Sequence, residues 1–353
     1  MSALSRKEIE RLIQWTISII ALCYISYRLL RFDGWSSFFE DTYNKLWLFA
    51  GLLLLQIGLS AINLTLETAK WRQLTLGLIR QSWYELLFQV LKGIQTGLIT
   101  PARVGEPLVK GALLPLGLRT KGFLMSAAGS IIQNIVILSG GIIAIVMLKV
   151  SFSAQQSSFV NLQRSLILYS LIATAAFAIT IGLFFLIIKS CKKHPKSTKL
   201  ISHLEALREL DKKRLARVFL LTLSRYALYN FQLWLMLSFF GITKNPADIA
   251  LVMLYYAAIT ILPTMAIADL GIRSSIALFL FGMLSPNSPA IVASVFMIWL
   301  INLALPSLVP LVIQANACRG KSQRLCHSGL REEANRFYPT TENQNQRDNY
   351  STS

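Results

Sequence analysis

The chain has 353 residues, of which 54% are hydrophobic and only 15% are charged, and its formal net charge is +18. Soluble globular proteins are typically about 45–50% apolar and about 25% charged, so the composition argues against a soluble domain. The basic residues gather in loops between apolar runs, which is typical of cytoplasmic loops in membrane proteins rather than of a nucleic-acid-binding surface. We therefore expect an all-α polytopic membrane protein with no nucleic-acid partner.

Six apolar segments are long enough to cross a hydrocarbon core about 30 Å thick. They lie at about 12–30, 46–67, 122–148, 165–188, 216–240 and 290–316. Basic loops, such as the one at 189–199, alternate with nearly neutral loops along the chain. The positive-inside rule then places both termini in the cytoplasm and predicts a multi-pass protein of the inner or plasma membrane.

Two further apolar regions, at about 84–118 and 249–284, are interrupted by proline, glycine and charge. The first begins and ends on the cytoplasmic side and the second on the outer side, so they would enter from opposite faces. Each is either a re-entrant helical hairpin or a pair of short spans. The halves, about 1–150 and 160–318, would thus form an inverted repeat, and interrupted segments at matching positions of such halves indicate a substrate site.

The interrupted regions carry similar motifs. In TPARVGEPLVK, Glu106 precedes Lys110 by four residues, and in PTMAIADLGIR, Asp269 precedes Arg273 by four. This order and spacing favour an ion pair along one helix face. If Pro101 opens the first helix, Arg103 joins that face. The motif backbone positions are Pro101, Gly105, Pro263 and Gly271.

Charges in a membrane interior are costly, so they usually face a cavity or a partner. We expect the two motifs to meet near the midplane and to bind an anionic lipid headgroup, because arginine matches phosphate geometry with paired donors. The candidate binding residues are Arg103, Glu106, Lys110, Asp269 and Arg273. The alternative is that these pairs only lock the hairpins.

Other polar residues in apolar segments are secondary candidates: Arg72, Gln133, Asn134, Arg225, Tyr226 and Gln232. Gln133 and Asn134 would line the cavity or join helices by hydrogen bonds. Arg225 would reach the site or extend to the inner interface. The AKWRQL stretch (69–74) reads as a membrane boundary with headgroup contact. Residues 1–318 form the predicted membrane domain, and the polar segment 319–353 a disordered cytoplasmic tail.

No cofactor, metal site or catalytic motif is expected. The chain shows no phosphate-binding glycine loop, and its three histidines, His194, His203 and His327, make no metal-ligand pair. Glu106 and Asp269 are the only candidate catalytic acids beside the cations, and each has an expected partner. We therefore do not expect an enzyme.

The stretches AKWRQL, TPARVGEPLVKGALL, LSRYALYNFQLW and ADLGIRSSIALF resemble the flippase-like membrane family related to the transmembrane domain of lysylphosphatidylglycerol synthase. The likeness runs from about residue 10 to 316. It implies a lipid-translocating domain with two re-entrant elements. Carried over by position, it implies functional roles for Arg103, Gly105, Glu106, Lys110, Asp269, Gly271 and Arg273. Bifunctional members add a cytosolic aminoacyltransferase domain with no counterpart here, so aminoacylation is not expected.

Two departures from the family pattern stand out. Arg273 is followed by Ser274 where the family commonly has an acid, and Gln133–Asn134 stands where a Glu–Arg pair is often found. Both changes leave open an impaired or retargeted activity.

The sequence thus predicts movement of a lipid or lipid-linked anion between leaflets without the chain's own ATPase. Membrane lipids with anionic headgroups would be the ligands, and a lipid-modifying enzyme a candidate partner. The alternatives are a secondary transporter of a small anion, a non-catalytic scaffold for a lipid-modifying partner, and a lipid-processing enzyme.

Overall fold

The structure is a computed structural model that describes residues 23–24, 26–100, 103–152, 211–262 and 266–313. These residues are almost entirely helical and contain no strand. The α-helices include α2 (Trp35–Asn44), α3 (Leu46–Thr75), α4 (Trp83–Ile99), α5 (Gly105–Ala112), α6 (Arg119–Phe152), α9 (Lys212–Phe239), α10 (Ile249–Ile261), α11 (Ala266–Phe281) and α12 (Ser288–Trp299), and residues 26–30 and 305–313 are helical as well. Short 3₁₀ turns, η2 (Leu116–Leu118) and η3 (Pro246–Asp248), precede α6 and α10, and a π-helical segment, η4 (Leu300–Ala304), follows α12.

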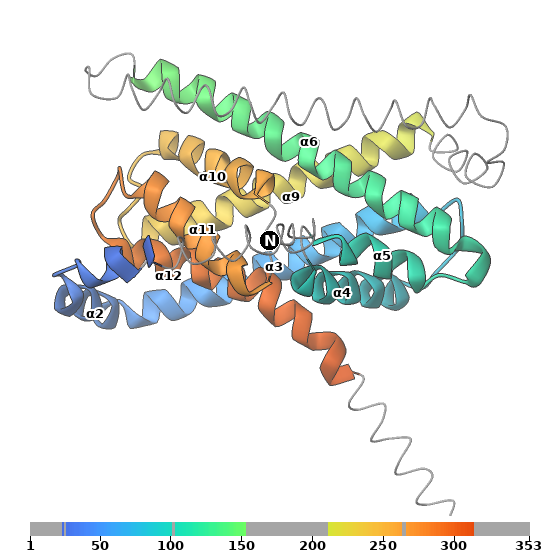
Figure 1. Ribbon diagram of the computed structural model, residues 1–353, viewed down its shortest axis with the longest axis horizontal. Coiled ribbons are helices and arrows are strands. Elements are labelled where there is room, and N and C mark those ends of the chain that lie inside the picture. Colours follow the sequence, from blue (N-terminus) through green and yellow to red (C-terminus); the bar gives the residue numbers. More distant parts are fainter. Residues whose placement is uncertain (1–22, 25, 101–102, 153–210, 263–265, 314–353) are drawn as a thin grey trace, which may run out of the picture. The chain divides into compact units, whose positions relative to one another are not determined.

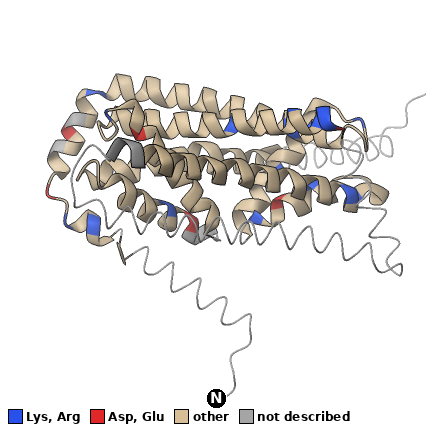
Figure 2. Cartoon of the chain, turned by 90° about the horizontal axis from the view of Figure 1, so that it is seen from above, with Lys and Arg blue, Asp and Glu red and all other residues tan. Residues whose placement is uncertain are grey.

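Three helical segments of the described residues are long and apolar enough to cross a membrane: Leu46–Thr75, Leu116–Leu148 and Ser288–Ile313. They coincide with the predicted spans at 46–67, 122–148 and 290–316. Figure 2 shows long helical stretches with neither acid nor base. The prediction of an all-α membrane protein is confirmed.

The other three predicted spans are not among these apolar segments. Helix α9 covers the predicted span 216–240, but it lies outside the three apolar segments because its sequence carries many charged and amide side chains. The span at 12–30 falls mostly outside the described residues, and the one at 165–188 falls wholly outside them. The predicted tail, 319–353, also lies outside them. The chain divides into two units, Met1–Ser307 and Leu308–Ser353, and the packing below is that of the first.

Each interrupted region consists of two helices. Helices α4 and α5 have 17 and 8 residues, and α10 and α11 have 13 and 16, so all are shorter than the ~20 residues of a full span. The breaks occur at the prolines. Thr100 and Leu262, the residues before Pro101 and Pro263, end α4 and α10 in extended conformations, as proline requires of its predecessor. Re-entrant hairpins, short spans and the sidedness of the ends stay predictions.

Helices α3 and α9 pack antiparallel. Gln56 donates its side-chain amide to the Gln232 carbonyl at 2.9 Å, and Gln232 donates back to the Gln56 carbonyl at 3.3 Å. Helix α6 lies against α9 and α10 through adjacent glycines. A Cβ on Gly140 would fall on the Tyr226 ring, and one on Gly141 would fall on Ala257. Figure 1 shows α6 running from α5 to α10.

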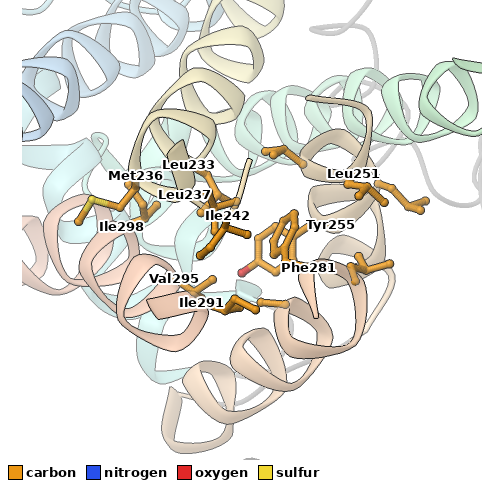
Figure 3. Packing of buried hydrophobic residues seen from close by; sticks show 14 of the residues in the cluster. Leu233, Met236, Leu237, Ile242, Leu251, Tyr255, Phe281, Ile291, Val295 and Ile298 are labelled. Atoms are coloured by element: carbon orange, nitrogen blue, oxygen red, sulfur yellow. The ribbon is translucent and has the colours of Figure 1, made fainter. Parts of the chain in front are cut away.

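Two apolar clusters form the core. The larger joins α9, α10, α11 and α12, with side chains such as Leu237, Tyr255 and Phe281 converging in Figure 3. The smaller lies around Trp71 and Val90. It joins the C-terminal end of α3 and the N-terminal ends of α6 and α9 to α4. On each of α3, α6 and α9 the two clusters occupy opposite ends, and the polar residues described next lie between them.

Candidate functional site

The first motif lies on a tight antiparallel hairpin made by α4 and α5, which Figure 1 shows side by side. A Cβ on Gly97 would meet Glu106 at 3.2 Å, and one on Gly93 would meet Lys110 at 2.9 Å. A step of four residues forward on α5, from Glu106 to Lys110, therefore corresponds to a step of four residues back on α4, from Gly97 to Gly93. Two glycines one turn apart let helices approach closely, as small residues do in membrane helix pairs. This approach places Glu106 and Lys110 directly over α4.

Hydrogen bonds of the Thr100 side chain hold the turn between α4 and α5. The Thr100 hydroxyl donates to the Thr96 carbonyl at 2.9 Å and accepts the Gly105 N–H at 2.8 Å. A Cβ on Gly105 would lie 2.8 Å from the Thr96 carbonyl oxygen, which explains the glycine in the motif. Arg103 has φ +56°, a left-handed conformation that costs a non-glycine residue about 1–2 kcal/mol. The predicted helix start at Pro101 is therefore wrong for Arg103, and α5 begins at Gly105.

Thr100→Val is expected to lower the free energy of unfolding by about 1–2 kcal/mol, because the isosteric side chain leaves the Gly105 N–H without its acceptor. Denaturant titration in detergent micelles measures the change. Thr65→Val is the matched control, since the Thr65 hydroxyl is exposed and bonds only within its own helix. Equal effects of the two substitutions would contradict the role given to Thr100.

The charged face of the hairpin runs from exposed to buried. Glu106 accepts Arg103 Nη2 at 3.2 Å and Lys110 Nζ at 2.9 Å, so the predicted ion pair along α5 is confirmed. The exposed fraction of the side chains falls from 40% at Arg103 to 18% at Glu106 and 3% at Lys110. The side chains of Arg103, Glu106 and Lys110 thus lead from the exposed surface into the interior.

Lys110 reaches a second carboxylate, Glu67 of α3, at 2.8 Å. Glu67 is also paired with Lys70 Nζ at 2.6 Å and with Arg225 Nη1 of α9. One carboxylate with 4% side-chain exposure therefore holds three buried bases from three helices. Such a charge is stable in an apolar interior only with good geometry and several partners.

Amide side chains complete this arrangement. Gln133 Oε1 of α6 accepts from Lys70 Nζ and from Arg225 Nη1, both at 3.1 Å. Asn63 Oδ1 of α3 accepts from Arg225 Nε at 2.8 Å. We call these residues the charge cluster: Asn63, Glu67, Lys70, Arg103, Glu106, Lys110, Gln133 and Arg225.

The charge cluster is not balanced. It contains four bases, Arg103, Lys70, Lys110 and Arg225, and the acids that pair with them among the described residues are Glu67 and Glu106. With all six ionised, the bases of the cluster carry two more positive charges than the carboxylates of the described residues supply to it. An excess of this kind in a mostly buried place favours an anionic ligand.

The second motif forms its own ion pair on α11. Arg273 Nε donates to Asp269 Oδ2 at 2.7 Å, so this predicted pair is confirmed too. Trp299 Nε1, at the end of α12, donates to the same oxygen at 3.2 Å. Gly271 lies between the paired residues in the sequence, and Ser274, the residue after Arg273, is buried.

A polar route connects the surroundings of the two motifs. The π-helical η4 begins directly after Trp299, and the side-chain Oδ1 of its Asn302 accepts from the side-chain Nδ2 of Asn63 at 3.4 Å. Asn63 in turn contacts Arg225. π-helical turns are rare and frequent at functional sites. The contacts described for Glu106 lead to α3 and α9, whereas those described for Asp269 lead to α12. A direct meeting of Glu106 and Asp269 at the midplane stays a prediction.

The secondary candidates separate into those in the charge cluster and those outside it. Gln133 and Arg225 belong to it. Tyr226 packs on Gly140, and Gln232 joins α9 to Gln56 of α3. Arg72 is exposed and Asn134 is half-buried. Pro101 and Pro263 lie outside the described residues.

Sequence reasoning missed the centre of the cluster. The sequence gives no sign of the role of Glu67, and the headgroup contact predicted for the AKWRQL stretch does not hold for Lys70 and Trp71, whose exposed fractions are only 4% and 1%. Its place at a membrane boundary stays a prediction. The available signal was the Glu67–Lys70 spacing of three residues near the end of a helix whose first 21 residues, Leu46–Leu66, carry no charge. That spacing places both side chains on one helix face.

The fold and this site define the class: a helical membrane protein that buries a cluster of acids and bases between apolar helices. A family model described as "Lysylphosphatidylglycerol synthase TM region" matches residues 13–309, and the chain belongs to this family. The resemblance seen in the motifs is thereby confirmed, and it associates the protein with lipid handling. Searches of curated proteins and of solved structures gave no match.

Proposed function

We propose that the chain moves a lipid or lipid-linked anion between the two leaflets of the inner or plasma membrane, without an ATPase of its own. The observation that carries the proposal is the uncompensated positive charge of the charge cluster, reached through the exposed Arg103. A headgroup phosphate supplies the missing negative charge, and arginine and lysine are its usual protein ligands.

The hairpin geometry supports translocation rather than surface binding. Non-helical backbone at membrane depth is tolerated where protein buries it or where it lines a polar cavity. In the proposal the break after Thr100 is such a place, and Arg103 follows it in a left-handed conformation beside the hydrogen bond from Gly105 N–H to Thr100. A headgroup would meet Arg103 first and the buried bases next, while its acyl chains stay beside the apolar helices.

Arg103→Gln is expected to slow lipid movement by about tenfold or more, because a hydrogen bond between charged groups is worth about 1.5–3 kcal/mol. The purified chain is reconstituted in liposomes, and the loss of fluorescence of acyl-labelled lipids on quenching the outer leaflet reports the movement. Folding should survive, since Glu106 keeps its Lys110 partner. Arg80→Gln, at an exposed position, is the matched control and should move lipid at the unchanged rate.

Other outcomes would point to the alternatives. No lipid movement by the unchanged chain would contradict the proposal. A lipid of altered mass after incubation would identify an enzyme, and uptake of soluble phosphate instead of lipid would identify a small-anion transporter. In the proposal the lipid is chemically unchanged, and an enzyme that modifies lipids is its expected partner in the membrane.

A further inference from the structure

Gln133 occupies a particular place in the charge cluster. Its Oε1 is the neutral acceptor shared by two buried bases, at 3.1 Å from Lys70 Nζ and 3.1 Å from Arg225 Nη1. A glutamate at this position would have nearly the same shape and would place a charged oxygen between the same two donors. The amide therefore accepts one hydrogen bond from each base and adds no negative charge to the cluster.

The lysines retain capacity for a further ligand. Each ammonium has three donors. Among the described residues, Lys70 meets oxygens of Glu67 and Gln133, and Lys110 meets oxygens of Glu67 and Glu106. Lys110 also lies over the Trp71 ring, with Nζ 5.9 Å from the ring centroid. A ligand that brings two negative charges would complete the cluster, whereas a phosphodiester brings one and a zwitterionic headgroup none.

We propose that Gln133 determines substrate charge, and that the site takes a doubly charged phosphate group, such as a phosphomonoester, in preference to a phosphodiester. This inference rests on the proposed function for its lipid form. A phosphomonoester carries about −1.5 to −2 charge near pH 7, which matches the two uncompensated bases. A single buried carboxylate in place of the amide would remove half of that excess and favour a singly charged headgroup.

The test compares lipids with identical labelled acyl chains and three headgroups in liposomes: a phosphomonoester (phosphatidic acid), a phosphodiester (phosphatidylglycerol) and a zwitterion (phosphatidylcholine). The unchanged chain should move the phosphomonoester about tenfold faster than the phosphodiester, and Gln133→Glu should abolish or reverse this ratio. Gln133→Met keeps the charge of the cluster and should keep the ratio even if the absolute rates fall. Lys70→Met removes one base by different chemistry and should shift the ratio in the same direction as Gln133→Glu.

A binding measurement separates this inference from the proposed function. Protection from thermal unfolding is measured with glycerol 3-phosphate and with the phosphomonoester lipid. Lipid movement with equal rates for all headgroups, or an unchanged ratio in Gln133→Glu and Lys70→Met, would overturn the charge inference and leave the proposed function intact. No movement of any lipid, together with phosphomonoester protection that Gln133→Glu weakens about tenfold in apparent affinity, would overturn the proposed function and support the charge inference. Protection by glycerol 3-phosphate as strong as by the lipid would show that a soluble anion is the ligand.

Discussion

Glu67→Gln is expected to lower the free energy of unfolding by about 3–5 kcal/mol, the cost of breaking a buried ion pair by removing one partner. Glu67 accepts from three buried bases: Lys70, Lys110 and Arg225. Its replacement leaves them a neutral amide, and only Lys110 keeps a described carboxylate partner, Glu106. Because the bases come from α3, α5 and α9, the loss should loosen contacts between all three helices. Denaturant titration in lipid–detergent bicelles, followed by helical circular dichroism, measures the change.

Glu40→Gln is the matched control, because Glu40 is an exposed glutamate on α2 and should change stability by less than about 0.5 kcal/mol. A double substitution, Glu67→Gln with Arg225→Gln, should recover part of the loss, since it removes one of the orphaned charges. Coupling between the two sites is expected because they are in direct contact. Additive effects of the two single substitutions would show that Glu67 is not the centre of the cluster.

Gly111→Ala is expected to cost about 1–3 kcal/mol by overpacking at the junction of α5 and α6. A Cβ at this glycine would lie 2.7 Å from the Phe123 amide nitrogen and 2.8 Å from the Arg119 carbonyl oxygen. Both are backbone atoms, so no side-chain rotation relieves the clash, and α5 must move away from α6. The hairpin would then carry Lys110, which adjoins Gly111, away from Glu67. Lipid movement should fall together with stability.

Gly58→Ala is the control for Gly111→Ala, and its expected effect on the free energy of unfolding has the opposite sign. A Cβ on Gly58, inside α3, would meet nothing within 4 Å. Gly58→Ala should therefore raise stability by about 0.4–1 kcal/mol, because alanine loses less conformational freedom on folding. If Gly111→Ala proved as harmless as Gly58→Ala, the close backbone contact between α5 and α6 would be disproved. Unfolding titrations of the two variants side by side decide the matter.

The sequence predicted the local features well, because their causes are local. Both helix breaks fall where a proline restricts the preceding residue, and both ion pairs follow from a four-residue spacing on one helix face. Gly105 was recognised as part of the motif, and its structural reason is the close approach of Thr96 and Thr100. The start of α5 was misplaced because the left-handed conformation of Arg103 has no signature in its own residue type.

The centre of the cluster could not be predicted in the same way. Glu67 lies 43 residues from Lys110 and 158 residues from Arg225, and nothing in the sequence near Glu67 specifies these partners. Lys70 and Trp71 resemble boundary residues because snorkelling lysines and interfacial tryptophans have the same local pattern. The packing of α4, α6 and α9 on α3 makes them buried residues, with Trp71 donating to Gln89 of α4 and Lys70 to Gln133 of α6. The sequence also gives no sign of the π-helical turn after Trp299, in which the Ile301 carbonyl accepts from the Ser60 hydroxyl of α3 at 3.1 Å.

The polar layer between the two apolar clusters also fixes how α3 and α9 are aligned along their length. Leucine-rich surfaces would pack almost equally well after a slide of one helical turn, about 5.4 Å. Such a slide would separate Arg225 from both Asn63 and Glu67. It would leave these buried charges without their partners among apolar side chains. The ionic contacts thus fix the axial register of α3 and α9. They select one alignment of the two helices among several that hydrophobic packing alone would permit.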